Sequence, residues 1–521
     1  MMRTVDLSSY FSAESRKRLG VILDVVLIAV LSALTFDSFE KYLRMELSHD
    51  ENFFVWQGWS LLKGEVPYKD FLELKPPMIF FVNALGILSF GLNDLAYRWI
   101  FFCLIYPSVV LFYLSLRRFG VLGVFAFLIV LHYVIVIFGP SFHDGSLNET
   151  ETLGLVFAVS GLALLLWQSP GNGRSVHWTK FIGGFFLGLS ILSKEPFLFA
   201  TVPVLLTYFL FHHENRLANL RSHLVTAIVG GLSAALVICA YLLIRGCFLE
   251  YVNTVLAELL YSESYAADTG IFRSNSVWKA AVLSLEILHE RYYNFSTLAL
   301  LLPFYAAFLY RYRLSLFFAV NFVGVALGAY AITLGHCFFS HYFLTGTVGL
   351  LSPAIYGGLF FSNCLRNAKG SVRWMLIVLV PIYCYAIAEC IAVSEDSFLR
   401  SRWYSYSLPA YLKDATDRLT VPGDHILVVD SPMRYVSLNR RHAFRGGLLI
   451  DEMIPFYEGS TEDEKLSRVK DEIEKKLPRI IYAPEDGPFR ARQQKHFRSV
   501  LYPIIRDHRY LDLGKGVFAL P

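Results

Sequence analysis

The chain has 521 residues, of which 55% are hydrophobic and only 17% are charged. Soluble globular proteins carry nearer a quarter charged residues, which argues against a wholly soluble fold. The net charge of +4 is too small to indicate a nucleic-acid partner. Charged residues are scarce in long apolar runs and dense after about residue 393. This distribution predicts a membrane domain, 1–393, followed by a soluble domain, 394–521.

Eleven apolar runs approach the length that a helix needs to cross a bilayer, about 20 residues. We predict transmembrane helices at 20–37, 97–116, 121–139, 152–168, 180–194, 196–212, 223–246, 297–310, 314–335, 342–362 and 374–393. A basic segment, 16–18, precedes the first run, and no small-residue cleavage site follows it. The first run is therefore predicted to remain as a membrane helix rather than to be removed as a signal peptide.

Basic residues in the short loops predict the orientation of these helices, because such residues are retained on the cytoplasmic side. The clusters are Arg16/Lys17/Arg18, Arg117/Arg118, Arg174/Lys180, Arg216/Arg221, Arg311/Arg313 and Arg366/Lys369/Arg373. They share one side only if the apolar stretch 78–90, which follows Pro76 and Pro77, does not cross. We predict that this stretch is a helix in the outer leaflet, within an outer loop 38–96. The loop 140–151 and the C-terminal domain then lie on the same outer face.

The C-terminal region has the pattern of a small α/β domain. Helical spacing or charge alternation predicts helices at 408–420, 462–477 and 493–507, and short apolar runs predict strands at 425–429, 479–483 and 516–520. A basic cluster is formed by Arg440, Arg441, His442 and Arg445. We interpret this cluster as a surface that faces solvent or lipid headgroups.

Carboxylates occur in both outer loops of the membrane domain. Asp50 and Glu51 follow the first run, and Glu149 and Glu151 precede the fourth. Acidic groups at the mouth of an apolar bundle are costly and often functional. Such groups hold a divalent metal or remove a proton from a hydroxyl. The alternatives are a solvated loop for the first pair and a favourable charge at a helix N-terminus for Glu149.

Cations recur at the same depth of the predicted bilayer. Lys75, Lys194 and His341 each border an apolar run at its outer end, where the orientation rule makes lysine less expected. Ammonium and imidazolium groups neutralise phosphate oxygens, so these residues are candidates for a phosphate site. For Lys194 the alternatives are snorkelling of the side chain or a local ion pair with Glu195.

These residues together resemble the GT-C superfamily of membrane glycosyltransferases, above all the bacterial protein-mannosyltransferase-like and aminoarabinose-transferase-like enzymes. The similar motifs are Asp50-Glu51, Lys75-Pro76-Pro77-Met78, Arg98 with Arg117-Arg118-Phe119-Gly120, the acidic loop with Glu149 and Glu151, Gly188 to Lys194, and His341-Tyr342-Phe343. Leu74 stands where aminoarabinose transferases commonly carry glutamate, and Glu73 lies one place earlier.

The resemblance implies a sugar donor linked to polyprenyl phosphate and transfer to a lipid, glycan or protein of the cell envelope, with inversion. Asp50 is then the general base, and Glu51, Glu149 and Glu151 position the acceptor or hold a divalent metal, Mg²⁺ or Mn²⁺. The residues expected at the donor phosphate are Lys75, Arg98, Lys194 and His341. The resemblance also implies a bacterial inner-membrane protein with a cytoplasmic N-terminus and a periplasmic active site.

Two other functions fit many membrane spans with ionisable residues. One is a transporter or lipid flippase, and the other is a non-catalytic subunit of surface-polysaccharide assembly. Transporters usually place their polar sites near the middle of the bilayer and often contain internal repeats. In this sequence the polar residues collect at the outer edge and no repeat is visible, which favours the transferase.

Overall fold

The structure is a computed structural model. It describes residues 13–44, 49–92, 95–138, 147–167, 173–212, 217–254, 300–313, 315–333, 342–367, 408–429, 431, 433–446, 461–484 and 491–521. The predicted span 374–393 lies outside the described residues, as do the predicted domain boundary at 393 and the candidate site residue His341.

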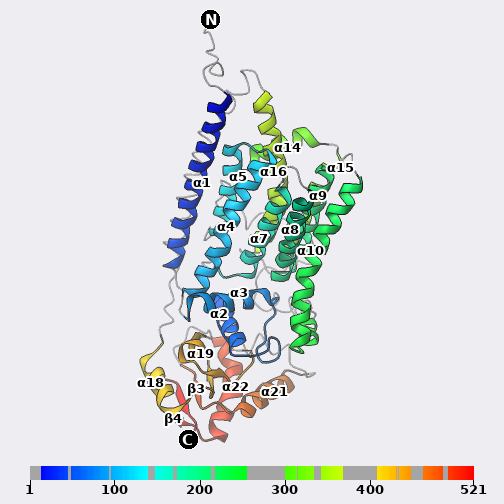
Figure 1. The fold of residues 1–521 in the computed structure, drawn as a ribbon. Coiled ribbons are helices and arrows are strands. Elements are labelled where there is room, and N and C mark those ends of the chain that lie inside the picture. The colour runs from blue at the N-terminus through cyan, green and yellow to red at the C-terminus, as the bar shows by residue number, and fades with distance from the viewer. Residues whose placement is uncertain are drawn as a thin grey trace.

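A bundle of long helices forms the larger part of the molecule (Figure 1). Its members are α1 (Ala13–Leu43), α4 (Ala96–Phe119), α5 (Gly123–Phe138), α7 (Thr150–Leu166), α8 (Gly173–Ser193), α9 (Phe197–His212), α10 (Leu217–Ile244), α14 (Leu302–Tyr312), α15 (Leu316–Thr333) and α16 (Phe343–Asn367). Each coincides with a predicted span. Within the described residues, four of them (α1, α4, α10 and α16) are long and apolar enough to cross a membrane by length and composition. The full count of eleven crossings stays a prediction.

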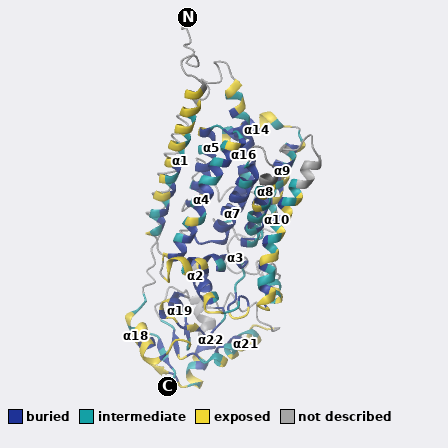
Figure 2. Cartoon of the chain, in the orientation of Figure 1, coloured by how far each residue is buried: buried dark blue, intermediate teal, exposed yellow. Residues whose placement is uncertain are grey.

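The burial of the bundle is graded from its centre to its edge (Figure 2). Helix α7 is buried over almost its whole length, whereas α1 leaves apolar side chains such as Leu19, Ile22 and Val25 exposed. In water such a surface would drive association. Against lipid tails it is compatible with a stable fold, so this grading is what a polytopic membrane protein requires.

Small residues bring the backbones of α8 and α10 into contact. A Cβ atom added to Gly184 would lie 1.9 Å from the carbonyl oxygen of Ala227, and one added to Gly230 would lie 2.0 Å from that of Phe181. Lipid tails are as apolar as leucine, so membrane helices associate through close packing of this kind. The glycines therefore determine how closely α8 and α10 approach.

We expect Gly184→Val to destabilise the bundle by about 1–3 kcal/mol, because the added methyl groups force two backbones apart. Thermal unfolding of the purified protein in detergent measures this change. Gly20→Val in α1 is the matched control, since no atom lies within 4 Å of a Cβ at that position. An equal loss of stability in both variants would argue against close packing as the cause.

Two further helices, α2 (His49–Leu62) and α3 (Met78–Phe90), lie between the bundle and the C-terminal sheet (Figure 1). The prediction of a helix at 78–90 is confirmed. At a rise of about 1.5 Å per residue its 13 residues span about 20 Å, less than the hydrocarbon core of about 30 Å. It exposes Leu85, Leu88 and Phe90. Helix α2 was not predicted, because this part of 38–96 was expected to be a loop.

The C-terminal region contains a five-stranded sheet with the order β2-β1-β3-β5-β4. The strands are β1 (His425–Val428), β2 (Arg441–His442), β3 (Ile480–Tyr482), β4 (Leu511–Asp512) and β5 (Val517–Ala519). β2, β1 and β3 are parallel, and β5 pairs antiparallel with β3 and β4. The helices are α18 (Ala410–Leu419), α19 (Met433–Leu438), α21 (Glu462–Lys476) and α22 (Ala491–Asp507). All six predicted elements are present, and α19, β2 and β4 are additional.

The basic cluster in this region is not the solvated surface that we predicted. Arg440 is buried and donates hydrogen bonds to the hydroxyl and carbonyl oxygens of Thr420, and His442 is buried against the membrane domain. Arg445 forms an ion pair with Glu472. Only Arg441 is exposed. The prediction was wrong because buried cations satisfied by distant partners cannot be recognised from composition.

Candidate active site

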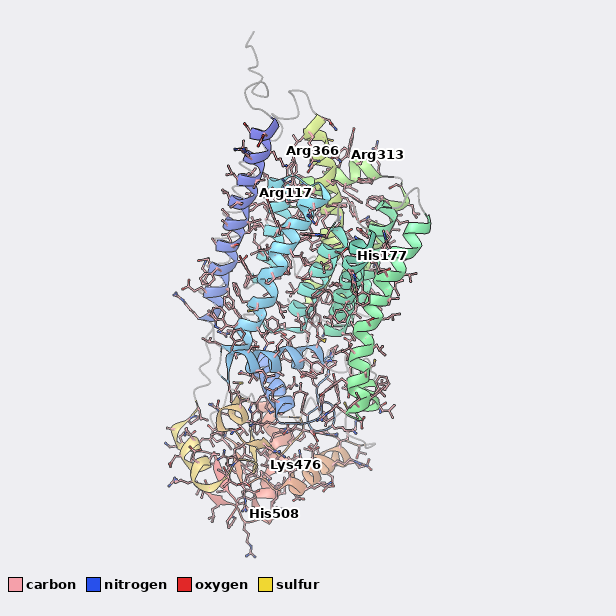
Figure 3. The ribbon with its side chains drawn as sticks, viewed as in Figure 1. Arg117, His177, Arg313, Arg366, Lys476 and His508 are labelled. Atoms are coloured by element: carbon pink, nitrogen blue, oxygen red, sulfur yellow. The ribbon has the colours of Figure 1, made fainter. Side chains whose placement is uncertain are left out.

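The ionic groups of interest lie at the end of the bundle that faces the C-terminal sheet. Figure 3 places Arg117, Arg313 and Arg366 at the opposite end of the molecule from Lys476 and His508, which belong to the C-terminal region. The basic loops and the C-terminal sheet are thus separated by the length of the bundle. This separation agrees with the predicted orientation, in which the basic loops are cytoplasmic.

Glu151 and Lys194 form a buried ion pair. Lys194 lies in the turn after α8, and its Nζ is 3.3 Å from Oε1 of Glu151, in the first turn of α7. The two side chains are 7% and 1% exposed. The Thr150 hydroxyl donates to Oε2 of Glu151 at 2.7 Å, and the lysine ammonium lies over the Tyr342 ring. Lys194 therefore has an ionic partner on another helix, which was not among the alternatives considered for it.

Glu51 and Arg98 form a second buried pair, which we call the junction. Oε2 of Glu51 lies 3.8 Å from Nη2 of Arg98, and the side chains are 0% and 3% exposed. Oε1 of Glu51 accepts from the backbone N–H groups of Leu147 and Asn148, each at 3.2 Å. Arg98 also donates to the carbonyl oxygens of Tyr42 and Leu43 at the end of α1. Both charged groups are therefore engaged by protein atoms from α1, α2, α4 and the loop before α7.

A reciprocal amide pair ties the same loop to α3. Nδ2 of Asn83 donates to Oδ1 of Asn148 at 2.9 Å, and Nδ2 of Asn148 donates to Oδ1 of Asn83 at 2.8 Å. Both side chains are buried. Glu149 follows directly as the N-cap residue of α7 and is also buried. The second acidic loop is thus held by α2 through Glu51 and by α3 through Asn83.

The segment 63–77 between α2 and α3 contains Lys75 and the partly buried carboxylate of Glu73. Oε2 of Glu73 accepts from Nε2 of Gln57 at 2.6 Å, and Oε1 accepts from the backbone N–H of Leu74 at 2.8 Å. Burial raises the pKa of Glu73 above its ordinary value, although the charge of Lys75 and the Gln57 hydrogen bond act in the opposite direction. The Tyr68 hydroxyl donates to the carbonyl oxygen of Lys75.

Asp50 differs from the other acidic candidates because its side chain is exposed. It occupies the first turn of α2, next to Glu51 in the junction. An anionic side chain is favoured at this position by the helix dipole. The junction fixes the start of α2, so Asp50 is a carboxylate of fixed position that remains accessible to a reactant.

The structure brings together some of the predicted residues and adds others. Glu51 joins Arg98, Glu151 joins Lys194, and Lys75 lies beside Glu73. Among the described residues, no three His, Cys, Asp or Glu side chains are gathered closely enough to hold a metal ion. Gln57 and Asn83 were missed, because an uncharged amide carries no signal until its partner is known.

Comparison with known proteins gives one family. Residues 74–242 match the model of the family described as dolichyl-phosphate-mannose-protein mannosyltransferase. This segment contains Lys75, Arg98, Glu151 and Lys194. No curated protein matches the chain.

Solved structures with a related arrangement include the oligosaccharyltransferase of Archaeoglobus fulgidus in a crystal structure with zinc and sulfate. The identity is 12%, the match covers 87% of this chain and 67% of that chain, and the TM-score is 0.49. The same archaeal enzyme with an inhibitory peptide and a dolichol-phosphate also matches, at 12% identity over 88% and 69% of the two chains, with a TM-score of 0.48.

The family match and the sequence motifs agree in their order along the chain. Lys75 stands at the start of the matching segment and Lys194 lies within it. The resemblance to GT-C enzymes is thereby confirmed over residues 74–242, which match the family described as dolichyl-phosphate-mannose-protein mannosyltransferase.

Proposed function

We propose that the protein transfers a sugar from a polyprenyl-phosphate donor to an acceptor of the cell envelope, at the outer face of the membrane. The proposal is supported above all by the family match over residues 74–242. Lys194 is joined to the start of α7 through Glu151, and Glu51, next to Asp50, accepts a hydrogen bond from Asn148 just before α7. The Tyr68 hydroxyl donates to the carbonyl oxygen of Lys75, and α3, which follows Lys75, contacts α8.

In the proposed reaction, Asp50 removes the proton of an acceptor hydroxyl. The hydroxyl oxygen attacks the anomeric carbon, and the bond between this carbon and the phosphate oxygen breaks on the opposite face, so the configuration inverts. Lys75 and Lys194, with His341, stabilise the negative charge that appears on the leaving polyprenyl phosphate. The acceptor is a lipid, a glycan or a protein.

In this proposal the remaining predicted residues position the reacting groups. Glu51 and Arg98 lie 3.8 Å apart and each hydrogen-bonds to surrounding backbone groups, so we assign them to holding Asp50 in place rather than to binding the donor phosphate. Glu151 orients Lys194. Glu149, at the start of α7, is assigned to the acceptor side.

The proposed location is the bacterial inner membrane. The N-terminus and the basic loops are cytoplasmic in this arrangement, and Asp50 and the C-terminal sheet are periplasmic. A lipid-linked donor suits such a site, because sugar nucleotides are cytoplasmic and the sequence contains no Gly-rich nucleotide-binding loop.

Purified protein in proteoliposomes, supplied with radiolabelled polyprenyl-phosphate sugars and a cell-envelope extract as acceptor, tests the proposal. We expect release of polyprenyl phosphate that depends on the extract. Movement of intact donor across the bilayer without bond cleavage would make the protein a transporter or flippase. Neither release nor movement would make it a non-catalytic subunit.

The same assay tests the predicted metal, Mg²⁺ or Mn²⁺. The carboxylates of Glu51 and Glu151 each already face a cationic side chain, and the proposed step needs no further cation. We therefore expect EDTA to leave the transfer rate unchanged. A rate that EDTA abolishes and Mn²⁺ restores would return these carboxylates to a metal-binding role.

A further inference from the structure

The C-terminal region contacts the segment 63–77 through a buried pair of ionisable side chains. Nε2 of His442, in β2, lies 2.9 Å from Oε2 of Glu65. Their side chains are 1% and 12% exposed. The two residues are 377 positions apart in the sequence, so the pair joins the sheet to the connection between α2 and α3. Figure 1 shows this connection running between the bundle and the sheet.

The hydrogen bonds of His442 involve both of its ring nitrogens. Nδ1 lies 2.9 Å from the carbonyl oxygen of Phe444, which can only accept. Nε2 faces Glu65, whose carboxylate also accepts. Burial raises the pKa of Glu65, but the hydrogen bond and charge of His442 outweigh it and hold the pKa below its ordinary value. Both ring nitrogens face oxygen acceptors, so a protonated His442 donates a hydrogen bond from each of them.

The other ionisable groups near His442 are basic, so Glu65 is its carboxylate partner. His425, Arg441 and Lys476 act electrostatically on the same region, and each is basic. The rings of Trp56 and Tyr435 lie against the imidazole, with centroids 4.9 and 6.0 Å away. A buried cation among basic neighbours requires a carboxylate, so loss of Glu65 leaves His442 without charge compensation.

A backbone hydrogen bond extends the same contact toward the candidate site. The N–H of Leu72 donates to the carbonyl oxygen of Arg445 at 2.8 Å, and the Arg445 backbone N–H donates to Glu472 of α21 at 2.7 Å. Glu73 follows Leu72 directly, and Lys75 lies three positions beyond Leu72. The C-terminal region therefore also contacts the segment 63–77 at Leu72, shortly before Lys75 in the chain.

The opposite side of the segment is attached to the end of α10. Nη2 of Arg245 donates to the carbonyl oxygen of Gly64 at 2.7 Å, and Nζ of Lys69 lies 3.4 Å from Glu250. The Lys69–Glu250 pair is solvent-exposed and contributes little. The buried Glu65–His442 pair is thus the stronger ionic attachment of the segment.

We propose that His442 is a positioning residue, whose side chain holds the segment 63–77 against the C-terminal sheet and so places Lys75 at the donor phosphate. Its effect on Lys75 rests on the function proposed above, whereas the attachment itself is independent of that function.

Hydrogen exchange of the full-length protein in detergent tests the attachment. In His442→Gln we expect the amides of 66–74 to exchange faster by about tenfold or more. Arg441→Gln is the matched control, because its side chain is exposed on the neighbouring position of the same strand, and it should leave these amides unchanged. Equal protection in His442→Gln and wild type would overturn the proposal, as would equal loss in both variants.

Glu65→Gln repeats the test from the other side and leaves the sheet itself unaltered, should His442→Gln fold poorly. We expect the same amides to exchange faster in Glu65→Gln. The double variant should show no further increase, because the same interaction is removed in each single variant and in the double variant.

Transfer kinetics test the consequence for Lys75. We expect His442→Gln to raise the KM for the donor by about tenfold with little change in kcat, since the donor phosphate is bound before the chemical step. If the amides of 66–74 exchange faster but the KM for the donor is unchanged, His442 has only a structural role. If no variant and no wild type transfers sugar, the proposed function fails while the exchange result still decides the attachment.

Discussion

Asp50→Asn is expected to lower the rate of sugar transfer by about 10²- to 10⁴-fold, the usual contribution of a general base. Asparagine has the same shape but accepts no proton from the acceptor hydroxyl. The side chain is exposed and Glu51, not Asp50, holds the start of α2, so the fold should tolerate the change. Measurement of kcat at saturating donor and acceptor gives the effect.

Asp37→Asn provides the control for this experiment. Asp37 is also an exposed carboxylate near the outer end of α1, where it pairs with Lys41 one helical turn away. We expect normal transfer in this variant and equal membrane insertion of both. Full activity in Asp50→Asn would remove Asp50 from the role of base and turn attention to the remaining carboxylates.

Lys194→Met is expected to have the largest effect on stability. It leaves the buried Glu151 carboxylate without its lysine, and breaking a buried ion pair on one side costs about 3–5 kcal/mol. The melting temperature of the purified protein should fall accordingly. Lys41→Met, which breaks a partly exposed pair within α1, should change the melting temperature little.

The double variant Lys194→Met/Glu151→Gln separates stability from activity. Removal of both charges should restore much of the lost stability, because no uncompensated carboxylate remains. Transfer should stay low, since the cation at the leaving phosphate is still missing. A double variant that is as unstable as Lys194→Met would show that the pair is not the source of the loss. A stable double variant with full activity would remove Lys194 from the phosphate site.

The positions of the elements follow largely from local properties of the sequence. The bounds of α3 were predicted because Pro76 and Pro77 precede a short apolar run. The prediction that α3 does not cross the membrane followed from the basic loops. The strands β1, β3 and β5 are short apolar runs between turn residues. Helix α2 was missed because its polar residues, such as Gln57, interrupt the apolar pattern and its burial comes from segments far along the chain.

The pairings at the site could not be predicted in the same way. The sequence indicated the depth of Lys194 and Glu151 in the membrane, and a local pair with Glu195 was only an alternative to a phosphate site for Lys194. The pair with Glu151 was not predicted, because apolar length and loop charge say nothing about which helices are neighbours. The prediction that the basic cluster faces solvent or lipid headgroups was wrong for the same reason. Arg440 and His442 are satisfied by Thr420 and Glu65, and neither partner can be identified before the chain is folded.

The junction of Glu51 and Arg98 has a consequence for how the outer loops open. It joins the end of α1, the start of α2 and the loop before α7 through shared hydrogen bonds. Segments that share buried bonds unfold as one cooperative unit. Asp50 and Glu151 therefore belong to a single cooperative unit, and an opening for the proposed acceptor is expected elsewhere at the rim of the bundle.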